Sequence, residues 1–285
     1  MTVLVTGATG TVGRQVVRHL REAGHPVRVL TRDPAKVDRD DVEVVAGDLA
    51  DTATLAGAFD GVEAAHLITF GKGGYLPLDN GQQIVDLAER AGVRTVSVLN
   101  GWHEGTLEPA VRASGLAWTF LAPVEFMANT SHDWGPTLRA TGVVREPYGD
   151  RPSPAVHESD IGAVAATVLT TDGHAGQVYR LTGPALVTPK EKIRLLAQAT
   201  GRDLRFEELT HEQARAEWMT NPPDLLFFQI GGASPKMVDL LLSVYRDAPE
   251  IGRTVTDAVS TVTGRPARSF ADWAIDHADE FTGPG

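Results

Sequence analysis

The first half of the chain alternates short β-branched runs with segments whose apolar residues recur at helical spacing. The first run is Val3–Thr6, and Val12–Glu22 follows it with apolar side chains at positions 12, 16, 17 and 20. Residues at this spacing share one face of a helix. Further strands are predicted at 27–31, 42–46, 64–69, 95–99 and 118–121, and further helices at 52–59, 80–91 and 107–114. This alternation predicts an α/β fold with a doubly wound parallel sheet, covered by helices on both faces.

The alternation breaks after Pro123. Residues 124–155 carry many Gly, Pro and aromatic residues, which predicts an excursion from the sheet. A helix over 159–169 and a strand over 178–181 predict a return to the sheet. Beyond residue 184 we expect a short strand at 205–208 and helices at 189–200, 211–219, 224–245, 255–262 and 269–281. We therefore expect one domain over 1–155, with its sheet completed by 156–182, and a smaller, mainly helical lobe over 183–285.

A glycine motif follows the first predicted strand. Residues 5–13 read VTGATGTVG, with glycines spaced GxxGxxG between a strand and a helix. The first glycine permits a tight turn, the second lets a pyrophosphate approach the backbone, and the third lets the helix pack closely on the strand. The N–H groups at the helix start then face the phosphates. The alternative is a tight turn without a ligand. The predicted pyrophosphate-binding residues are Gly7, Thr9, Gly10, Thr11, Val12 and Gly13.

The end of the second predicted strand bears on the choice of coenzyme. Thr31 and Arg32 stand where NAD-binding proteins usually carry a carboxylate for the ribose 2′-hydroxyl. The guanidinium groups of Arg32 and of Arg14 suit a 2′-phosphate or can stack on adenine. We therefore favour NADP over NAD. The alternative is that Arg32 is only solvated and that Asp33 weakens its field.

Other strand ends complete the predicted coenzyme site. Asp48 and Leu49 close the third strand, where a carboxylate and an apolar side chain can hold and cover adenine. The alternative for Asp48 is an ordinary helix N-cap. Thr69 and Phe70 follow the fourth strand and are expected beside the nicotinamide ribose. Asn100 follows the fifth strand, whose end faces the nicotinamide in such folds.

Three residues are candidates for catalysis. Asn100 is placed to hydrogen-bond a substrate oxygen, and His103 is able to deliver a proton near neutral pH. Tyr75 ends a glycine-rich loop over 71–75 that is suited to act as a lid. The alternatives are that Asn100 only begins a turn, that His103 and Glu104 form a solvated pair, and that the loop is a plain connection.

Aromatic residues form the predicted substrate contacts. Tyr75, Trp102, Phe126 and Trp134 lie near the predicted strand ends and suit a flat aromatic substrate. The alternative is packing between the lobes, and for Trp134 this alternative is preferred. The chain has no cysteine and no HExxH or comparable ligand spacing, so no metal site is predicted.

Charge and hydropathy narrow the class of protein. A formal charge of −11 argues against a nucleic-acid partner, which would need a basic face. No apolar run reaches the length of a membrane span, and the first predicted strand leaves no room for a signal peptide. We expect a cytoplasmic protein whose partner is a small molecule. The oligomeric state stays open, with a homodimer as one alternative.

The glycine motif together with HPVRVLTRDP, VEVVAGDL, RASGLAWTFLAPVEFMANT and VHESDIGAVAA resembles the NmrA-like group of atypical short-chain dehydrogenases/reductases. The resemblance covers almost the whole chain. It implies a Rossmann domain, NAD(P) bound along Gly7–Gly13, and a substrate between this domain and the C-terminal lobe. The group contains quinone reductases, dye reductases, plant ether reductases and a transcriptional regulator that binds the nucleotide without turning it over.

The chain departs from this group in its proton donors. Most short-chain dehydrogenases use a Tyr-x-x-x-Lys pair, and none of the four tyrosines here has lysine four residues later. The lysine of the ether-reductase branch falls at Glu104. Ordinary interconversion of alcohols and ketones is therefore in doubt.

Our leading hypothesis is an NAD(P)H-dependent oxidoreductase that acts on a quinone or polycyclic aromatic, as in a tailoring step of secondary metabolism. Hydride transfer to a quinone gives a stabilised oxyanion, which water or His103 can protonate. The alternative is a non-catalytic NAD(P) redox sensor that binds a protein partner. A third reading is a non-redox isomerase or lyase that holds the coenzyme structurally.

Overall fold

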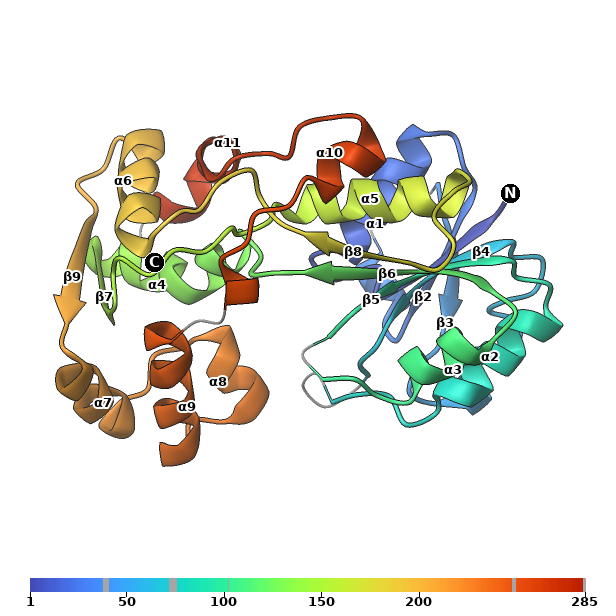
Figure 1. Ribbon diagram of the computed structural model, residues 1–285, viewed down its shortest axis with the longest axis horizontal. Helices are drawn as coiled ribbons and strands as arrows, with labels where there is room; N and C mark the ends of the chain where they lie inside the picture. The colour runs from blue at the N-terminus through green and yellow to red at the C-terminus, as the bar shows by residue number, and fades with distance from the viewer. Residues whose placement is uncertain (38–40, 72–75, 102, 248–249, 284–285) are drawn as a thin grey trace. The chain divides into compact units, whose positions relative to one another are not determined.

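The computed structural model describes residues 1–37, 41–71, 76–101, 103–247 and 250–283 (Figure 1). Contacts between Cα atoms divide the chain into two compact units. Unit 1 consists of Met1–Pro123, Glu158–Leu181 and Ala258–Arg265. Unit 2 consists of Val124–His157, Thr182–Asp257 and Pro266–Gly285. Among the described residues, the helices are all too short or too polar to cross a membrane.

Unit 1 contains a seven-stranded parallel sheet in the order β3-β2-β1-β4-β5-β6-β8. The strands are β1 (Val3–Thr6), β2 (Val27–Thr31), β3 (Glu43–Ala46), β4 (Ala64–Ile68), β5 (Thr95–Leu99), β6 (Ala117–Pro123) and β8 (Gln177–Leu181). The order reverses between β1 and β4, which is where such sheets bind their ligands. The predicted fold class is confirmed, as is the return of the chain to the sheet, where β8 pairs with β6.

Helices cover both faces of this sheet (Figure 1). On one face α1 (Gly13–Glu22) packs beside α5 (Glu158–Thr170), and on the other α2 (Gly81–Arg90) packs beside α3 (Leu107–Ala113). Because both faces are covered, β1 and most of β4 are fully buried and read as apolar runs. The helix predicted over 52–59 is only a 3₁₀ turn at Thr52–Leu55, because Gly57 takes a φ of 77° and interrupts it.

Unit 2 is mainly helical. Its helices are α4 (Asn129–Thr141), α6 (Pro189–Thr200), α7 (His211–Thr220), α8 (Leu226–Gly231), α9 (Pro235–Arg246) and α11 (Phe270–Asp276). A two-stranded parallel sheet joins β7 (Val143–Pro147) to β9 (Arg205–Leu209). The single helix predicted over 224–245 is two helices, because Gly232 has a φ of 74° and Pro235 starts a new helix. One apolar core gathers Met127, Trp134 and Leu138 with Leu196 and Trp273, and a second gathers Trp218, Phe228 and Leu241.

The compact units differ from the predicted domain boundary. Residues 124–157, expected with the nucleotide domain, group with unit 2, because α4 joins its core and β7 pairs with β9. Residues 258–265 group with unit 1, because α10 (Ala258–Thr263) packs on α5 and β8. Both differences come from pairings between segments far apart in the chain, which local patterns do not reveal.

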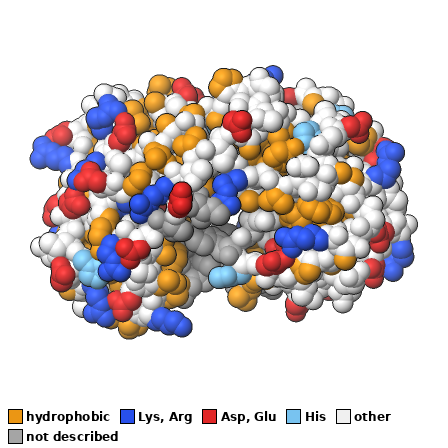
Figure 2. All heavy atoms as spheres, viewed as in Figure 1, with side chains coloured by type: hydrophobic (Ala, Val, Ile, Leu, Met, Phe, Trp, Pro, Cys, Tyr) orange, Lys and Arg blue, Asp and Glu red, His pale blue; other side chains and the backbone are white. Residues whose placement is uncertain are grey.

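The surface carries acidic and basic side chains in alternation. On the face drawn in Figure 2, no continuous basic area is visible.

A histidine is buried in the centre of the main sheet. His66 of β4 is fully buried, and its Nδ1 lies 2.8 Å from Ser97 Oγ on the neighbouring strand β5. The Thr6 hydroxyl donates to the His66 carbonyl oxygen at 3.0 Å. Burial disfavours the imidazolium and lowers the pKa of His66 from 6.5 to about 4.

This pKa shift predicts a specific loss of stability in acid. Above pH 6.5, His66 is neutral in both the folded and the unfolded state. As the pH falls from 6.5 towards 4, only the unfolded state takes up the proton, so the free energy of unfolding falls by about 3 kcal/mol from this group. We expect H66Q to remove this part of the slope in urea unfolding measured between pH 7 and pH 4. H174Q, at a half-buried histidine, should keep the wild-type slope, and parallel slopes for H66Q and wild type would contradict the assignment.

Candidate functional site

The glycine loop connects β1 to α1. Gly7 has a φ of 63°, in the left-handed region that favours glycine, and its carbonyl accepts the Gly10 N–H at 2.9 Å. A Cβ on Gly13 would lie only 2.1 Å from the Gly7 carbonyl oxygen. The first turn of α1 is therefore held directly against the end of β1, and a side chain at Gly13 would push the two apart.

The start of α1 is suited to bind an anion. Residues 13–22 form the helix, every residue of its first turn is described, and none of them is acidic. Val12 occupies the cap position and has no polar side chain to take up the free N–H groups. Thr9, Gly10 and Thr11 are exposed, whereas Val12 is buried. The unpaired N–H groups and the helix dipole together favour a phosphate here.

An open hollow of about 540 Å³ lies next to this loop. It follows the carboxyl ends of β1, β2 and β3. It is lined by Thr9, Thr31, Arg32, Asp33, Lys36, Gly47, Asp48 and Thr54. Four of these residues were predicted to bind coenzyme or to mark its specificity, so the structure brings the glycine loop, the Arg32 end and the Asp48 end together. The sequence analysis missed Lys36, for which the only signal was a second cation four positions after Arg32.

Arg32 is exposed at the edge of this hollow. Within the described part of the chain, its guanidinium group has no hydrogen-bond or ion-pair partner. Asp33 instead accepts the Ala35 N–H at 3.2 Å and lies 3.7 Å from the Lys36 ammonium. Asp33 thus forms no ion pair with Arg32 among the described residues, and whether it weakens the field of Arg32 is not tested by these contacts. Arg14 folds back onto the loop, with its Nε donating to the Gly10 carbonyl oxygen at 3.3 Å.

Asp48 and Leu49 play different parts. Asp48 lines the hollow, and one of its carboxylate oxygens accepts the Ala50 N–H at 3.0 Å. Asp51, not Asp48, caps the 3₁₀ turn by accepting the Ala53 N–H at 3.1 Å. The Leu49 side chain is buried in the core of unit 1, so it does not cover a ligand from the hollow.

A second group of predicted residues meets at the ends of β4 and β5. The buried Thr69 hydroxyl donates to the Leu99 carbonyl at 3.4 Å and accepts the Gly101 N–H at 3.0 Å. The Asn100 N–H donates to the Leu121 carbonyl at 2.9 Å. Its side-chain Oδ1 is buried, with no hydrogen-bond partner among the described residues. A buried acceptor without a protein partner is unusual, and it is available to a donor group of a ligand.

The other residues predicted around this point have different surroundings. Phe70 forms an isolated antiparallel bridge with Pro77. Tyr75 and Trp102, predicted to contact the substrate, lie outside the described residues. His103 is exposed, and Glu104 pairs with Arg112 rather than with His103. The alternative of a His103–Glu104 pair is therefore wrong.

The two predicted substrate residues of unit 2 have separate surroundings. Phe126 is half-buried and forms a parallel bridge with Val156. Trp134 is 6% exposed within the core of unit 2, and its indole N–H donates to Glu146 Oε1 at 2.7 Å. This placement favours a packing role for Trp134.

The core of unit 2 also holds charged pairs that the sequence analysis did not find. Arg151 donates to Glu146 Oε2 at 2.6 Å and stacks on the ring of Tyr245, with its Cζ 3.7 Å from the ring centroid. The buried Lys192 ammonium lies 2.6 Å from Glu125 Oε1. Burial, followed by the nearby Glu146 carboxylate, raises the pKa of the Tyr245 phenol above its ordinary range. Most of these partners are far apart in the chain, so no local sequence motif predicts the pairs.

The residues of unit 1 fit a dinucleotide at three points. The closely packed glycine turn leaves backbone N–H groups for a pyrophosphate, the hollow offers cations beyond the end of β2, and Asn100 Oδ1 offers an unused acceptor beyond β5. Together they follow the carboxyl edge of the sheet on both sides of the β1–β4 reversal.

Comparison with known proteins agrees with this geometry. The model of the NmrA-like family matches residues 1–97. The chain is 38% identical to a (4-alkanoyl-5-oxo-2,5-dihydrofuran-3-yl)methyl phosphate reductase of Streptomyces griseus, over 98% of this chain and 99% of that protein. It is 34% identical to an NAD(P)H azoreductase of Xenophilus azovorans, over 98% and 99% of the two chains. Among solved structures, an NADPH-dependent quinone oxidoreductase of Escherichia coli complexed with NADPH has a TM-score of 0.74 at 23% identity, over 95% and 98% of the chains.

These relatives extend over nearly the full length of the chain, and the named ones are oxidoreductases. The protein is accordingly an NAD(P)H-dependent oxidoreductase with a Rossmann-type coenzyme domain. On the evidence of its fold, its glycine loop and these relatives, the chain belongs to the NmrA-like family.

Proposed function

We propose that the protein reduces a quinone or another extended, conjugated aromatic compound, with NADPH as the preferred coenzyme. The observation that carries the proposal is the composition of the β5 end. It offers the buried acceptor Asn100 Oδ1 and the exposed His103, while the chain has no Tyr-x-x-x-Lys pair. Such a site can orient a substrate and a coenzyme but has little means to force a proton onto a simple ketone.

The coenzyme, when bound, supplies the hydride. The loop N–H groups at the start of α1 bind its pyrophosphate, and Thr69 keeps the ends of β4 and β5 together by bonding both Leu99 and Gly101. Asn100 Oδ1 accepts a hydrogen bond from a ligand N–H or O–H group and thereby fixes its orientation. A conjugated acceptor spreads the resulting negative charge over its ring system, so water or His103 suffices to protonate it.

Named relatives support this substrate class. One relative is a quinone oxidoreductase, another an azoreductase, and a third reduces an unsaturated furanone that carries an alkanoyl group and a phosphate. A quinone and this furanone both contain a C=C bond conjugated with a carbonyl group, and an azo compound contains an N=N bond. A tailoring step in secondary metabolism stays a prediction.

We assign the 2′-phosphate of NADP to the hollow beyond β2. Arg32 is exposed there, Lys36 lies in the same lining, and Asp33 is engaged by the backbone and by Lys36. Two cations beside a hydroxyl-lined hollow suit a phosphate better than a bare ribose hydroxyl.

We further propose that unit 2 supplies substrate contacts, with Phe126 as the described aromatic candidate. The roles of Tyr75 and Trp102 in substrate binding stay predictions, as do the cytoplasmic location and a homodimer. Trp134 is assigned to packing, because its ring is buried and its N–H is used by Glu146.

The proposal is tested by following the absorbance of reduced nicotinamide with purified protein, NADPH and a panel of quinones and polycyclic ketones. We expect saturable oxidation of NADPH with the quinones and none with simple aliphatic ketones. The matched control is the same panel without protein. Tight NADPH binding without any loss of absorbance on every quinone would contradict the proposed substrate class and favour the redox-sensor alternative.

The coenzyme preference depends on Arg32. We expect R32A to weaken NADPH binding by roughly 10- to 100-fold, as for the loss of a charge-assisted hydrogen bond, and to leave NADH binding nearly unchanged. The measurement is the dissociation constant of each coenzyme from fluorescence titration. R94A, which removes an exposed arginine paired with Glu63, serves as the control and should behave as wild type. Equal weakening for both coenzymes in R32A would refute the assignment.

The roles of Asn100 and His103 separate in steady-state kinetics. We expect N100A to lower kcat/KM for the quinone by about 10- to 100-fold, because a buried hydrogen bond to a ligand is lost. H103Q should lower kcat modestly, because a candidate proton donor is lost. H174Q should leave kcat as in the wild type. If H103Q also keeps the wild-type kcat, water is the proton donor and His103 has no catalytic role.

A further inference from the structure

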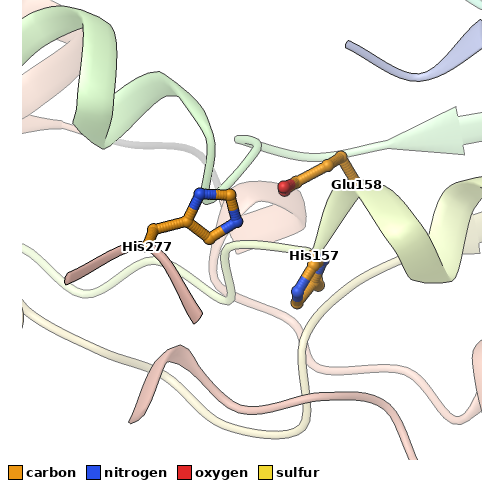
Figure 3. Close-up of side chains that lie close together, drawn as sticks. All are labelled: His157, Glu158 and His277. Atoms are coloured by element: carbon orange, nitrogen blue, oxygen red, sulfur yellow. The ribbon is translucent and has the colours of Figure 1, made fainter. Parts of the chain in front are cut away.

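Three potential metal ligands lie together outside the coenzyme site. They are His157, Glu158 and His277, and Figure 3 shows their side chains close together. Each offers one ligand atom, and these atoms lie within 4.8 Å of one another. His157 and Glu158 are consecutive residues, so the peptide bond between them holds this half of the cluster. Both are almost fully buried, with 5% and 3% of their surface exposed.

The third ligand is oriented by its own neighbours. His277 Nδ1 lies 2.8 Å from Glu280 Oε1, so in the neutral ring Nδ1 carries the proton and donates it to the carboxylate. The lone pair is then on Nε2. The His277 ring is stacked on Trp273, with centroids 4.5 Å apart and planes 18° apart, which fixes its plane. A histidine whose other nitrogen donates to a carboxylate is the usual arrangement of a metal-ligating histidine.

We propose that His157, Glu158 and His277 bind a divalent transition-metal ion, with Zn²⁺ as the best match. Two imidazoles and one carboxylate are the borderline nitrogen and oxygen ligands that Zn²⁺ accepts, and this chain has no thiolate to offer. Around a tetrahedral ion with bonds of about 2.1 Å, ligand atoms lie about 3.4 Å apart. Binding therefore requires ligand atoms that lie up to 4.8 Å apart to approach one another by up to about 1.4 Å.

The site would act as a cross-link in the chain. His157 and His277 both belong to unit 2 but stand far apart in the sequence, and their rings are 6.3 Å apart between centroids. An ion held by both closes this long loop in the folded state only, so binding stabilises the fold. The site shares no residue with the glycine loop or with the hollow beyond β2. Its function is therefore structural and independent of hydride transfer.

The test uses the full chain, stripped with a chelator and dialysed, and titrated with ZnCl₂ in a calorimeter. We expect one ion per chain and a higher Tm with Zn²⁺ than without it. H277Q and H157Q should each weaken binding by at least about 100-fold, and E280Q, which alters only the orienting carboxylate, by about 10- to 100-fold. H132Q is the matched control, because His132 also lies beside a carboxylate, 2.9 Å from Asp133, but lacks a third ligand. It should bind Zn²⁺ as wild type does.

Two results would overturn the proposal. One is the absence of binding heat and of any Tm shift in the wild-type chain, which would make the cluster a hydrogen-bonded histidine–carboxylate group. The other is binding that H157Q, H277Q and E280Q leave unchanged, which would place the ion at surface carboxylates. Circular dichroism establishes that each variant is folded. If H277Q does not fold, the exposed E280Q variant decides, with unchanged affinity counting against the site and weakened affinity for it.

Discussion

The close contact between Gly13 and the Gly7 carbonyl is the constraint on which the coenzyme domain depends. With no side chain at Gly13, the first turn of α1 touches the end of β1 and its N–H groups open toward the ligand. A second glycine extends the same principle outward, because a Cβ on Gly162 would lie 2.6 Å from Gln15 Cβ and 2.7 Å from its carbonyl carbon. Strand β1, helix α1 and helix α5 are thus stacked at two backbone contacts that tolerate no larger residue.

Polar contacts between α1 and α5 fix the position of these two helices along each other. Arg18 Nη2 donates to Ser159 Oγ at 2.5 Å, and His19 Nε2 lies 3.1 Å from the Ser159 carbonyl oxygen. Ser159 is the second residue of α5, and it contacts α1 through both its hydroxyl and its carbonyl oxygen. The anion-binding end of α1 is therefore supported from behind by α5, which keeps the loop preorganised for its ligand.

Charged side chains have different surroundings in the two units. In unit 1, Arg32 and Lys36 line one hollow together with Asp33 and Asp48. Lys36 lies 3.7 Å from Asp33, so the exposed Arg32 guanidinium is the charge that we assign to a phosphate. In unit 2 the charges are paired in the interior, as Glu146 with Arg151 and Glu125 with Lys192. Such pairs add little net stability over apolar packing, but breaking one leaves a buried charge, so they specify a single arrangement of α4, α6 and β7.

The sequence by itself determined the parallel sheet, the glycine loop, the Arg32 end of β2 and the mainly helical second part, because each depends on residues that are close in the chain. Tertiary structure decided the rest. Residues 124–157 belong to unit 2 because β7 pairs with β9, which lies far along the chain. Leu49 is buried in the core, although Asp48 directly before it lines the hollow. In the structure the Trp134 indole N–H donates to Glu146, which favours the packing role preferred for this residue from the sequence. The metal site that we propose at His157, Glu158 and His277 is not predicted by ligand spacing, since a site built from distant segments leaves no periodic pattern in the sequence.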